Sequence, residues 1–280
     1  MLNSVFNYLS HLKLNFLDVS MSTFIYHKIN YDLNMECNFT YEHYSDTLKN
    51  IKKTHKFSSY KNYSTNDVIL RHDVDTSLIA ALKLAKIEND LDISSTFFLY
   101  LSSEFYNSFG EKSHKMINQI LDLGHKIGLH YSEDFILKNN LDPSNTIRKE
   151  IDFFEYHYNT TIEAISAHEA NSFPPSMKIS LPDNVENAYS EKFVKDRKYL
   201  SDSAMFWREG CFCQHFTHFD KLQILIHPMW WNENKKTRSE IMALFLNDEY
   251  DQYTKLVKSD AEKHENWAKI LSSNDPRLKT

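Results

Sequence analysis

Two aspartates separated by one residue follow a short apolar run and form the clearest chemical feature of the sequence. The run is Val68-Ile69-Leu70, and the aspartates are Asp73 and Asp75. Side chains alternate faces along extended backbone, so both carboxylates point one way while His72 points the other. Two carboxylates this close repel each other unless a positive charge lies nearby. A divalent metal ion bound by one carboxylate would supply that charge and leave the other carboxylate to act as a general base.

The elements that position this pair alternate along the chain. Apolar and β-forming runs predict strands over residues 68–71, 95–101, 126–130, 161–167, 199–203 and 222–226. Helical periodicity predicts helices over residues 77–89, 111–123, 144–157 with Ser144 as the cap, 237–247 and 249–270. Strands that alternate with helices imply parallel strands joined by crossovers, which is an α/β fold.

Polar residues stand at the carboxyl ends of five predicted strands. They are Asp73, His130, His168, Asp202 and His227. Because β/α barrels place their sites at that face, five converging strand ends favour a closed or nearly closed barrel over an open sheet. We expect residues 39–280 to form this barrel as a single domain, with helices at its C-terminal end. Residues 1–38 are expected to be an N-terminal extension that packs on the body.

A divalent metal needs about three protein ligands and one open position. Asp75 offers an oxygen and His130 a nitrogen at the end of its own strand. His168 is our first choice for the third ligand, while Glu133 and Asp134 lie one turn past His130 and stay open as alternatives. The set suits zinc best, with iron, cobalt or manganese as other candidates.

Two further residues have the chemistry of a general base and a general acid. Asp73 beside the metal would be the base, the alternative being an acid at a helix N-terminus that pairs with Arg71. His227 follows an apolar strand and would be the acid, because histidine titrates near neutral pH. The Met229-Trp-Trp231 segment that follows offers a flat surface on which a sugar ring could stack, although such pairs are also common in protein cores.

Composition excludes several classes of protein. The net charge is −6 and there is no basic stripe, which argues against a nucleic-acid partner. The 3 cysteines are too few for a disulfide framework and favour a reducing compartment. Cys211-Phe-Cys213 has the spacing of half a thiolate metal site, but there is no second cysteine pair to complete it, so we expect none there. With no run of membrane-spanning length and no signal-peptide pattern, we expect a cytoplasmic protein.

Taken in order, these segments resemble the NodB-homology polysaccharide deacetylases, carbohydrate esterase family 4 in the broad sense. His72-Asp-Val-Asp75, Gly124-His-Lys-Ile-Gly-Leu-His130 and Leu225-Ile-His-Pro228 resemble the family's acidic-pair, metal and acid-histidine motifs. Arg71–Asp75, Tyr199–Ser203 with Trp207–Gly210, and His227–Trp231 resemble a branch found with surface-polysaccharide genes. The likeness spans roughly residues 39–232, and the motifs are short but correctly ordered.

The resemblance implies a distorted (β/α) barrel with about seven parallel strands and a division of labour within the site. It implies that Asp73 is the base, that Asp75 and His130 bind the metal, and that His227 is the acid. Asp134 stands where the family has a second metal histidine, and Ser166–Asn171 replaces the family's Arg-x-Pro-Tyr motif, so Arg71 is our candidate partner for Asp73. The residues that we place at the substrate are Arg71, Asp202, Trp207, Arg208 and Trp231.

We therefore predict a metal-dependent hydrolase that removes an N-acetyl or other N-acyl group from an amino sugar. A cytoplasmic setting favours a nucleotide- or lipid-linked glycan precursor as substrate. One alternative is a deformylase or O-deacetylase on the same scaffold. Another is a catalytically lapsed protein that binds carbohydrate or assists assembly. No phosphate-binding glycine loop and no Gly-x-Ser-x-Gly elbow are present, which removes the signatures of nucleotide hydrolysis and serine esterases.

Overall fold

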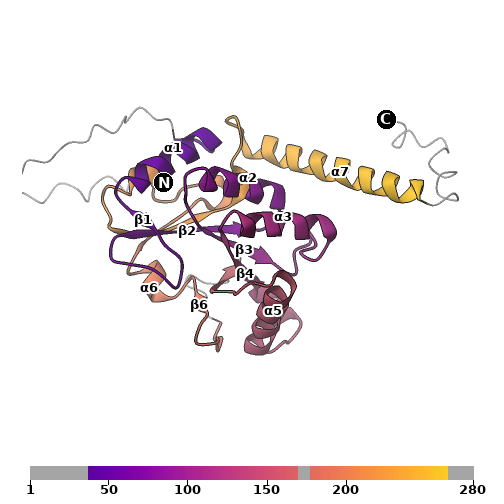
Figure 1. The fold of residues 1–280 in the computed structure, drawn as a ribbon, viewed down its shortest axis with the longest axis horizontal. Helices are drawn as coiled ribbons and strands as arrows, with labels where there is room; N and C mark the ends of the chain where they lie inside the picture. Colours follow the sequence, from indigo (N-terminus) through magenta and orange to yellow (C-terminus); the bar gives the residue numbers. More distant parts are fainter. Residues whose placement is uncertain (1–36, 170–176, 264–280) are drawn as a thin grey trace, which may run out of the picture. The chain divides into compact units, whose positions relative to one another are not determined.

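A curled sheet of parallel strands forms the centre of the molecule (Figure 1). The computed structural model describes residues 37–169 and 177–263. These described residues belong to one compact unit. The strand order is β6-β5-β4-β3-β2-β8-β7, with β1 paired to β2, and every pairing is parallel. The strands are β1 Lys56–Phe57, β2 Asp67–Val74, β3 Thr96–Tyr100, β4 Lys126–Ser132, β5 Ala164–His168, β6 Glu186–Asn187, β7 Lys198–Ser201 and β8 Lys221–Ile226. The fold is the predicted distorted (β/α) barrel with an open seam.

Helices follow most of the strands, as the sequence predicts. They are α1 Tyr41–Lys52, α2 Leu78–Asn89, α3 Glu111–Asp122, α4 Glu133–Lys138, α5 Pro143–Tyr158, α6 Glu191–Val194 and α7 Arg238–Glu262. No described helix has the length and apolar character needed to cross a bilayer. Helix α1, which the sequence did not predict, is capped by Thr40, whose side chain accepts a hydrogen bond from the His43 amide. Most of the predicted extension, residues 1–36, lies outside the described residues, so its packing stays a prediction.

Two helix predictions need correction. The cap of α5 is Asp142, with Pro143 in the first turn, and Ser144 lies inside the helix. The two helices expected over residues 237–270 are one helix, α7, which begins at a capping box between Thr237 and Glu240. Neither Gly nor Pro stands near Asn247 to end a helix there. The predicted part beyond residue 263 lies outside the described residues.

The two faces of the sheet differ in polarity and in what they contact. The outer face packs on α2, α3 and α5 through a large apolar cluster that includes Phe97, Leu99, Ile127 and Leu129. The inner face carries a small cluster with Ile69 and Phe98, and then polar side chains toward the strand ends. Gly128 belongs to the inner face, where a Cβ would lie 2.6 Å from the Phe98 ring. The barrel interior is therefore filled at one end and open for chemistry at the other.

A buried polar network fixes β2 against α2. His72 Nε2 lies 2.8 Å from Glu88 Oε1, while Tyr44 donates to the same carboxylate and Ser95 to its other oxygen. His125 Nδ1 lies 3.7 Å from Glu88 Oε2, so it shares the outer face with His72. Because His72 is anchored on this side, Asp73 and Asp75 are turned inward.

Replacing Glu88 with alanine should destabilise the fold. The change leaves His72, Tyr44 and Ser95 buried without their common acceptor, and breaking a buried ionic network of this kind costs about 3–5 kcal/mol. Urea unfolding followed by circular dichroism measures the loss. Asp90→Ala, at the exposed end of α2, is the control and should change the free energy of unfolding by less than about 0.5 kcal/mol. Equal midpoints for the two variants would contradict the role of the network.

Candidate active site

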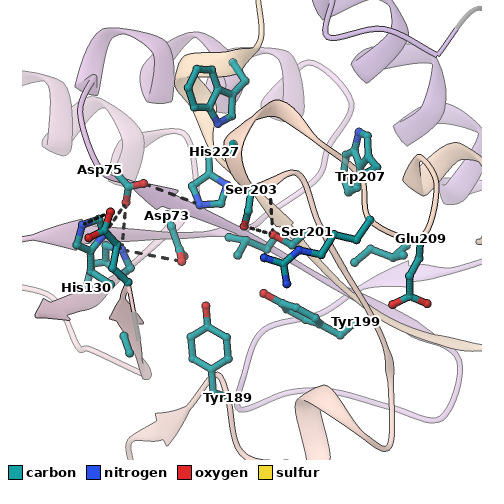
Figure 2. Close-up of a pocket in the computed structure, with 18 of the residues that line it drawn as sticks. Asp73, Asp75, His130, Tyr189, Tyr199, Ser201, Ser203, Trp207, Glu209 and His227 are labelled. Carbon is teal, nitrogen blue, oxygen red and sulfur yellow. Dashed lines mark hydrogen bonds and ion pairs between the residues drawn. The ribbon is translucent and has the colours of Figure 1, made fainter. Parts of the chain in front are cut away.

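The carboxyl ends of β2, β4, β5, β7 and β8 open into one pocket with a volume of about 590 Å³ (Figure 2). Five of the polar residues singled out from the sequence line it: Asp73, Asp75, His130, His168 and His227. Trp207 and Arg208, expected at the substrate, also line the pocket. Convergence of strand-end side chains on one cavity is what the barrel interpretation required.

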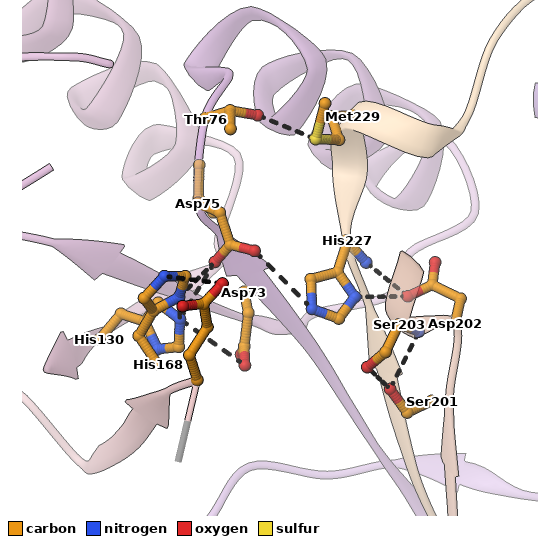
Figure 3. A network of polar contacts seen from close by, with 12 residues as sticks. Asp73, Asp75, Thr76, His130, His168, Ser201, Asp202, Ser203, His227 and Met229 are labelled. Carbon is orange, nitrogen blue, oxygen red and sulfur yellow. Dashed lines mark hydrogen bonds and ion pairs between the residues drawn. The ribbon is translucent and has the colours of Figure 1, made fainter. Parts of the chain in front are cut away.

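Asp75, His130 and His168 form a compact group of potential metal ligands (Figure 3). One ligand atom from each lies within 4.8 Å of the others. His130 Nε2 is 3.1 Å from Asp75 Oδ1 and 3.2 Å from His168 Nδ1. His168 Nδ1 in turn is 3.4 Å from Asp75 Oδ1. A carboxylate oxygen and two imidazole nitrogens are a common ligand set for a divalent transition metal.

Hydrogen bonding shows that a cation fits this group. His130 Nδ1 lies 3.0 Å from the Ser166 carbonyl oxygen, which can only accept, so this nitrogen carries the proton. With Nδ1 bonded to this carbonyl, His130 presents Nε2 toward Asp75 Oδ1, which is the orientation that a metal ligand needs. Burial raises the pKa of Asp75, but hydrogen bonds with His130 and His168 hold it well below its usual range. Asp75 is thus held as a carboxylate, and a metal ion bound between its Oδ1 and His130 Nε2 would take the place of the hydrogen bond that joins them.

The other two candidates for the third ligand lie elsewhere. Asp134 is on the surface of α4, where its carboxylate is 2.8 Å from Lys138. Glu133, in the first turn of the same helix, is not part of the three-residue group. The structure thus brings His168, and neither acid, together with Asp75 and His130.

Asp73 lies beside this group and is held by two buried donors. Its Oδ2 accepts from Arg71 Nη2 at 3.1 Å and from Ser166 Oγ at 3.1 Å. His130 Nε2 is 4.0 Å away. Arg71 is fully buried, and its guanidinium lies 4.5 Å from the centre of the Tyr189 ring. Arg71 is therefore the counter-ion of Asp73, and the expectation that it contacts substrate is corrected, because it has no surface to offer.

His227 faces the metal group from the opposite wall. Its Nδ1 lies 2.6 Å from Asp202 Oδ1, and its Nε2 points inward, 3.9 Å from Asp75 Oδ2 (Figure 3). The second oxygen of Asp202 accepts from the Trp231 indole at 2.9 Å. Burial lowers the pKa of His227, but the hydrogen bond and charge of Asp202 outweigh it and raise the pKa to about 9.

Asp202 and Trp231 are buried, so their expected contacts with substrate are corrected as well. Asp202 is 0% exposed and both its oxygens are in use, which makes it a support for His227. Trp231 packs behind Asp202, and it is its neighbour Trp230 that lines the pocket. Sequence alternation could not separate these two, because both lie past the end of β8.

Comparison with known proteins gives matches to solved structures only. No protein-family model matches the chain, and no curated protein matches at a significant level. A CE4 family pseudoenzyme from Bacillus anthracis is 14% identical, over 66% of this chain and 60% of that chain, with a TM-score of 0.36. This chain thus spans about three fifths of that protein's length.

Two further matches are similarly distant. A family 4 acetyl xylan esterase from Clostridium thermocellum, in complex with a cobalt ion, is 14% identical over 57% of this chain and 73% of that chain, with a TM-score of 0.34. A chitin deacetylase from the fungal pathogen Colletotrichum lindemuthianum is 13% identical over 65% and 81%, with a TM-score of 0.35. The surface-polysaccharide branch stays a prediction. At such similarity, the chemistry has to be inferred from the site itself.

Three residues in or beside the pocket were not among the predicted site residues. Ser166 lies two residues before His168 on β5, so strand alternation places it on the same inner face and could have found it. Tyr189 and Tyr199 line the pocket opposite the metal group. Burial raises the pKa of Tyr199 well above its usual range, so it is a neutral hydrogen-bonding group at working pH. Tyr189 lies in a loop region, where the sequence carried no signal for it.

Proposed function

We propose that this chain is a metal-dependent hydrolase that removes the N-acetyl group of an amino sugar. The observation that carries the proposal is one pocket in which a three-residue ligand group, a buried carboxylate and a histidine held by an aspartate face one another. Hydrolysis of an unreactive amide needs these parts: an electrophile for the carbonyl, a base for water and an acid for the leaving amine.

Asp73 is suited to take the proton of the attacking water. Arg71 and Ser166 occupy its Oδ2, while Oδ1 is buried and has no hydrogen-bond partner among the described residues. A water at Oδ1 would complete that atom's hydrogen bonding and be oriented for attack. A divalent ion held by Asp75, His130 and His168 would supply Lewis acidity toward the acyl carbonyl and would lower the pKa of water.

His227 is suited to protonate the leaving nitrogen. Because Nδ1 donates to the carboxylate of Asp202, the proton on the inward-facing Nε2 is the one available for transfer. Water gives a proton to Asp73 and adds its oxygen to the acyl carbon. The carbon–nitrogen bond then breaks as the nitrogen takes the proton of His227, and the proton on Asp73 restores the balance. The products are acetate and a free amino sugar.

The wall around this centre suits a sugar. The rings of Trp207, Trp230, Tyr189 and Tyr199 line the cavity and offer apolar faces on which pyranose rings could stack. Arg208 is exposed at the rim, where a guanidinium would bind a phosphate group. We therefore extend the proposal to an amino sugar carried on a nucleotide or lipid phosphate.

A paired product assay tests the proposed activity. The full chain loaded with zinc is incubated with N-acetylated, N-formylated and O-acetylated amino sugars, free and as nucleotide diphosphate conjugates. Acetate and new primary amine should appear in equal amounts from the N-acetyl substrates. Preferential release of formate would support the deformylase alternative. Acetate without new amine would support the O-deacetylase, and glycan binding with no product would support the lapsed alternative.

The pH dependence of kcat/KM should report His227. As an acid it must be protonated, so activity persists below its pKa of about 9 and falls as the pH rises through that value. Asp202→Asn removes the charge that raises this pKa, and the alkaline limb should move down by roughly 1–2 pH units. Asp134→Asn, which removes a carboxylate on the surface of α4, should leave the limb in place. An unmoved limb in Asp202→Asn would mean that another group is the acid.

A further inference from the structure

A second group of metal-ligand side chains lies outside the residues that line the catalytic pocket. Cys37, His43, Cys211 and Cys213 each place one ligand atom within 4.8 Å of the others. Cys37 Sγ is 3.2 Å from Cys213 Sγ, and His43 Nε2 is 3.2 Å from Cys211 Sγ. All 3 cysteines of the sequence gather here. From the sequence we expected no metal site at Cys211-Phe-Cys213 for want of a second cysteine pair. In the structure, Cys37 and His43, more than 160 positions away, lie beside these two cysteines.

The geometry of this Cys3His group fits a tetrahedral metal ion better than a disulfide. A disulfide has its sulfur atoms about 2.05 Å apart, whereas the Cys37 and Cys213 sulfurs are 3.2 Å apart and all three thiols are free. Zinc bonds of about 2.3 Å to sulfur and about 2.1 Å to nitrogen place tetrahedral ligand atoms roughly 3.6–3.8 Å apart. Two of the separations in this group are 3.2 Å, and all four ligand atoms lie within 4.8 Å of one another, so small shifts would bring them to that spacing.

His43 supplies an independent reason. It is 2% exposed, and its Nδ1 has no hydrogen-bond partner among the described residues. Its Nε2 lies 3.2 Å from the Cys211 thiol, which is a weak hydrogen-bond partner. A buried imidazole so poorly satisfied is costly unless a metal ion takes its lone pair. We propose that Cys37, His43, Cys211 and Cys213 bind one structural zinc ion.

Four protein ligands leave a tetrahedral zinc no open position, which is the mark of a structural site. The ion would tie the segment before α1 to the loop after the pocket residues Trp207 and Arg208. Backbone hydrogen bonds of 2.9 Å from Tyr41 to Asn232 and from Asn232 to Phe39 run beside the same junction. The site would therefore hold one wall of the pocket in place.

Ring contacts connect this group with the catalytic histidine. The imidazole of His43 stacks on Trp231, with centroids 6.4 Å apart and planes at 8°. Trp231 donates to Asp202, which holds His227. Phe212, between the two cysteines, stacks on Trp207 with centroids 5.4 Å apart. Loss of the ion should therefore loosen the support of His227 as well as the fold.

Cobalt substitution of the full chain tests the proposal. The catalytic group contains no sulfur, so thiolate-to-cobalt charge-transfer absorption can arise only from the Cys3His group. This readout stays valid even if the proposed hydrolase activity is wrong. We expect the reduced wild-type protein to show that absorption together with the visible bands of tetrahedral cobalt. The Asp75→Ala/His130→Ala double variant, which lacks two ligands of the catalytic group, should still retain about one zinc ion per chain.

Variants make the test specific. Cys211→Ser should lose both the sulfur–cobalt absorption and the bound zinc. Cys37 is exposed, so its loss should not prevent folding, and Cys37→Ser should weaken zinc binding at least about 100-fold. His218→Ala, an exposed histidine near the same loop, is the control and should retain both. The proposal is overturned if reduced wild-type protein gives no sulfur–cobalt absorption, or if Cys37→Ser binds zinc as tightly as the wild type.

Discussion

Replacing Asp75 with alanine is expected to abolish both metal binding at the catalytic group and hydrolysis. Asp75 is the anionic member of the group, and its Oδ1 lies next to both histidine nitrogens. Without it, only the two imidazoles of the group remain to hold a divalent ion. Losing the Lewis acid removes several kcal/mol of transition-state stabilisation, so kcat/KM should fall at least about 10³-fold. Metal analysis and the acetate assay on the same sample measure both effects.

Asp134→Ala is the matched control, because sequence analysis left Asp134 open as a ligand while the structure pairs it with Lys138. It should keep wild-type metal content and activity. The number of metal ions bound per chain is best compared in a Cys211→Ser background, so that zinc at the Cys3His group does not mask the loss of the catalytic metal. If Asp75→Ala keeps its catalytic metal and Asp134→Ala loses it, the ligand set is wrong.

Replacing Asp73 with asparagine should separate metal binding from turnover. The amide oxygen can still accept from Arg71 and Ser166, but asparagine cannot take a proton from water. We expect metal content to match the wild type and kcat/KM to drop by about 10²–10⁴-fold, the usual contribution of a general base. Full activity in Asp73→Asn would refute the assignment of the base.

Stability has to be controlled in this variant. Asp73 is the counter-ion of the buried Arg71, so removing its charge should also lower the free energy of unfolding by about 3–5 kcal/mol. Activity is therefore compared at a temperature at which circular dichroism shows both proteins folded.

The placement of the acidic pair followed from local rules. Apolar runs located the strands to within a few residues, and alternation along β2 turned Asp73 inward and His72 outward. Parallel strands then had to bring Asp73, His130 and His168 to one edge. These steps use only backbone geometry and side-chain polarity, which is why sequence alone was sufficient.

What the sequence could not provide depends on contacts beyond the strands. Asp202 lies just past β7, before Ala204, whose φ is 54°, so no strand period fixes where its carboxylate points. Its role beside His227 appears only once β7 and β8 are paired. The Cys3His group needs Cys37 and His43 to meet a loop far along the chain. Spacing rules for metal motifs assume nearby residues and so miss it.

X-ray data collected at the absorption edge of the bound metal test the central claim most directly. We predict an anomalous peak at about 2.0–2.2 Å from Asp75, His130 and His168, beside Asp73 and within reach of His227. A second peak at the Cys3His group would be a separate result and would not count toward this claim. In metal-loaded crystals, an absent catalytic peak, or one bound by Glu133 or Asp134 in place of His168, would contradict it.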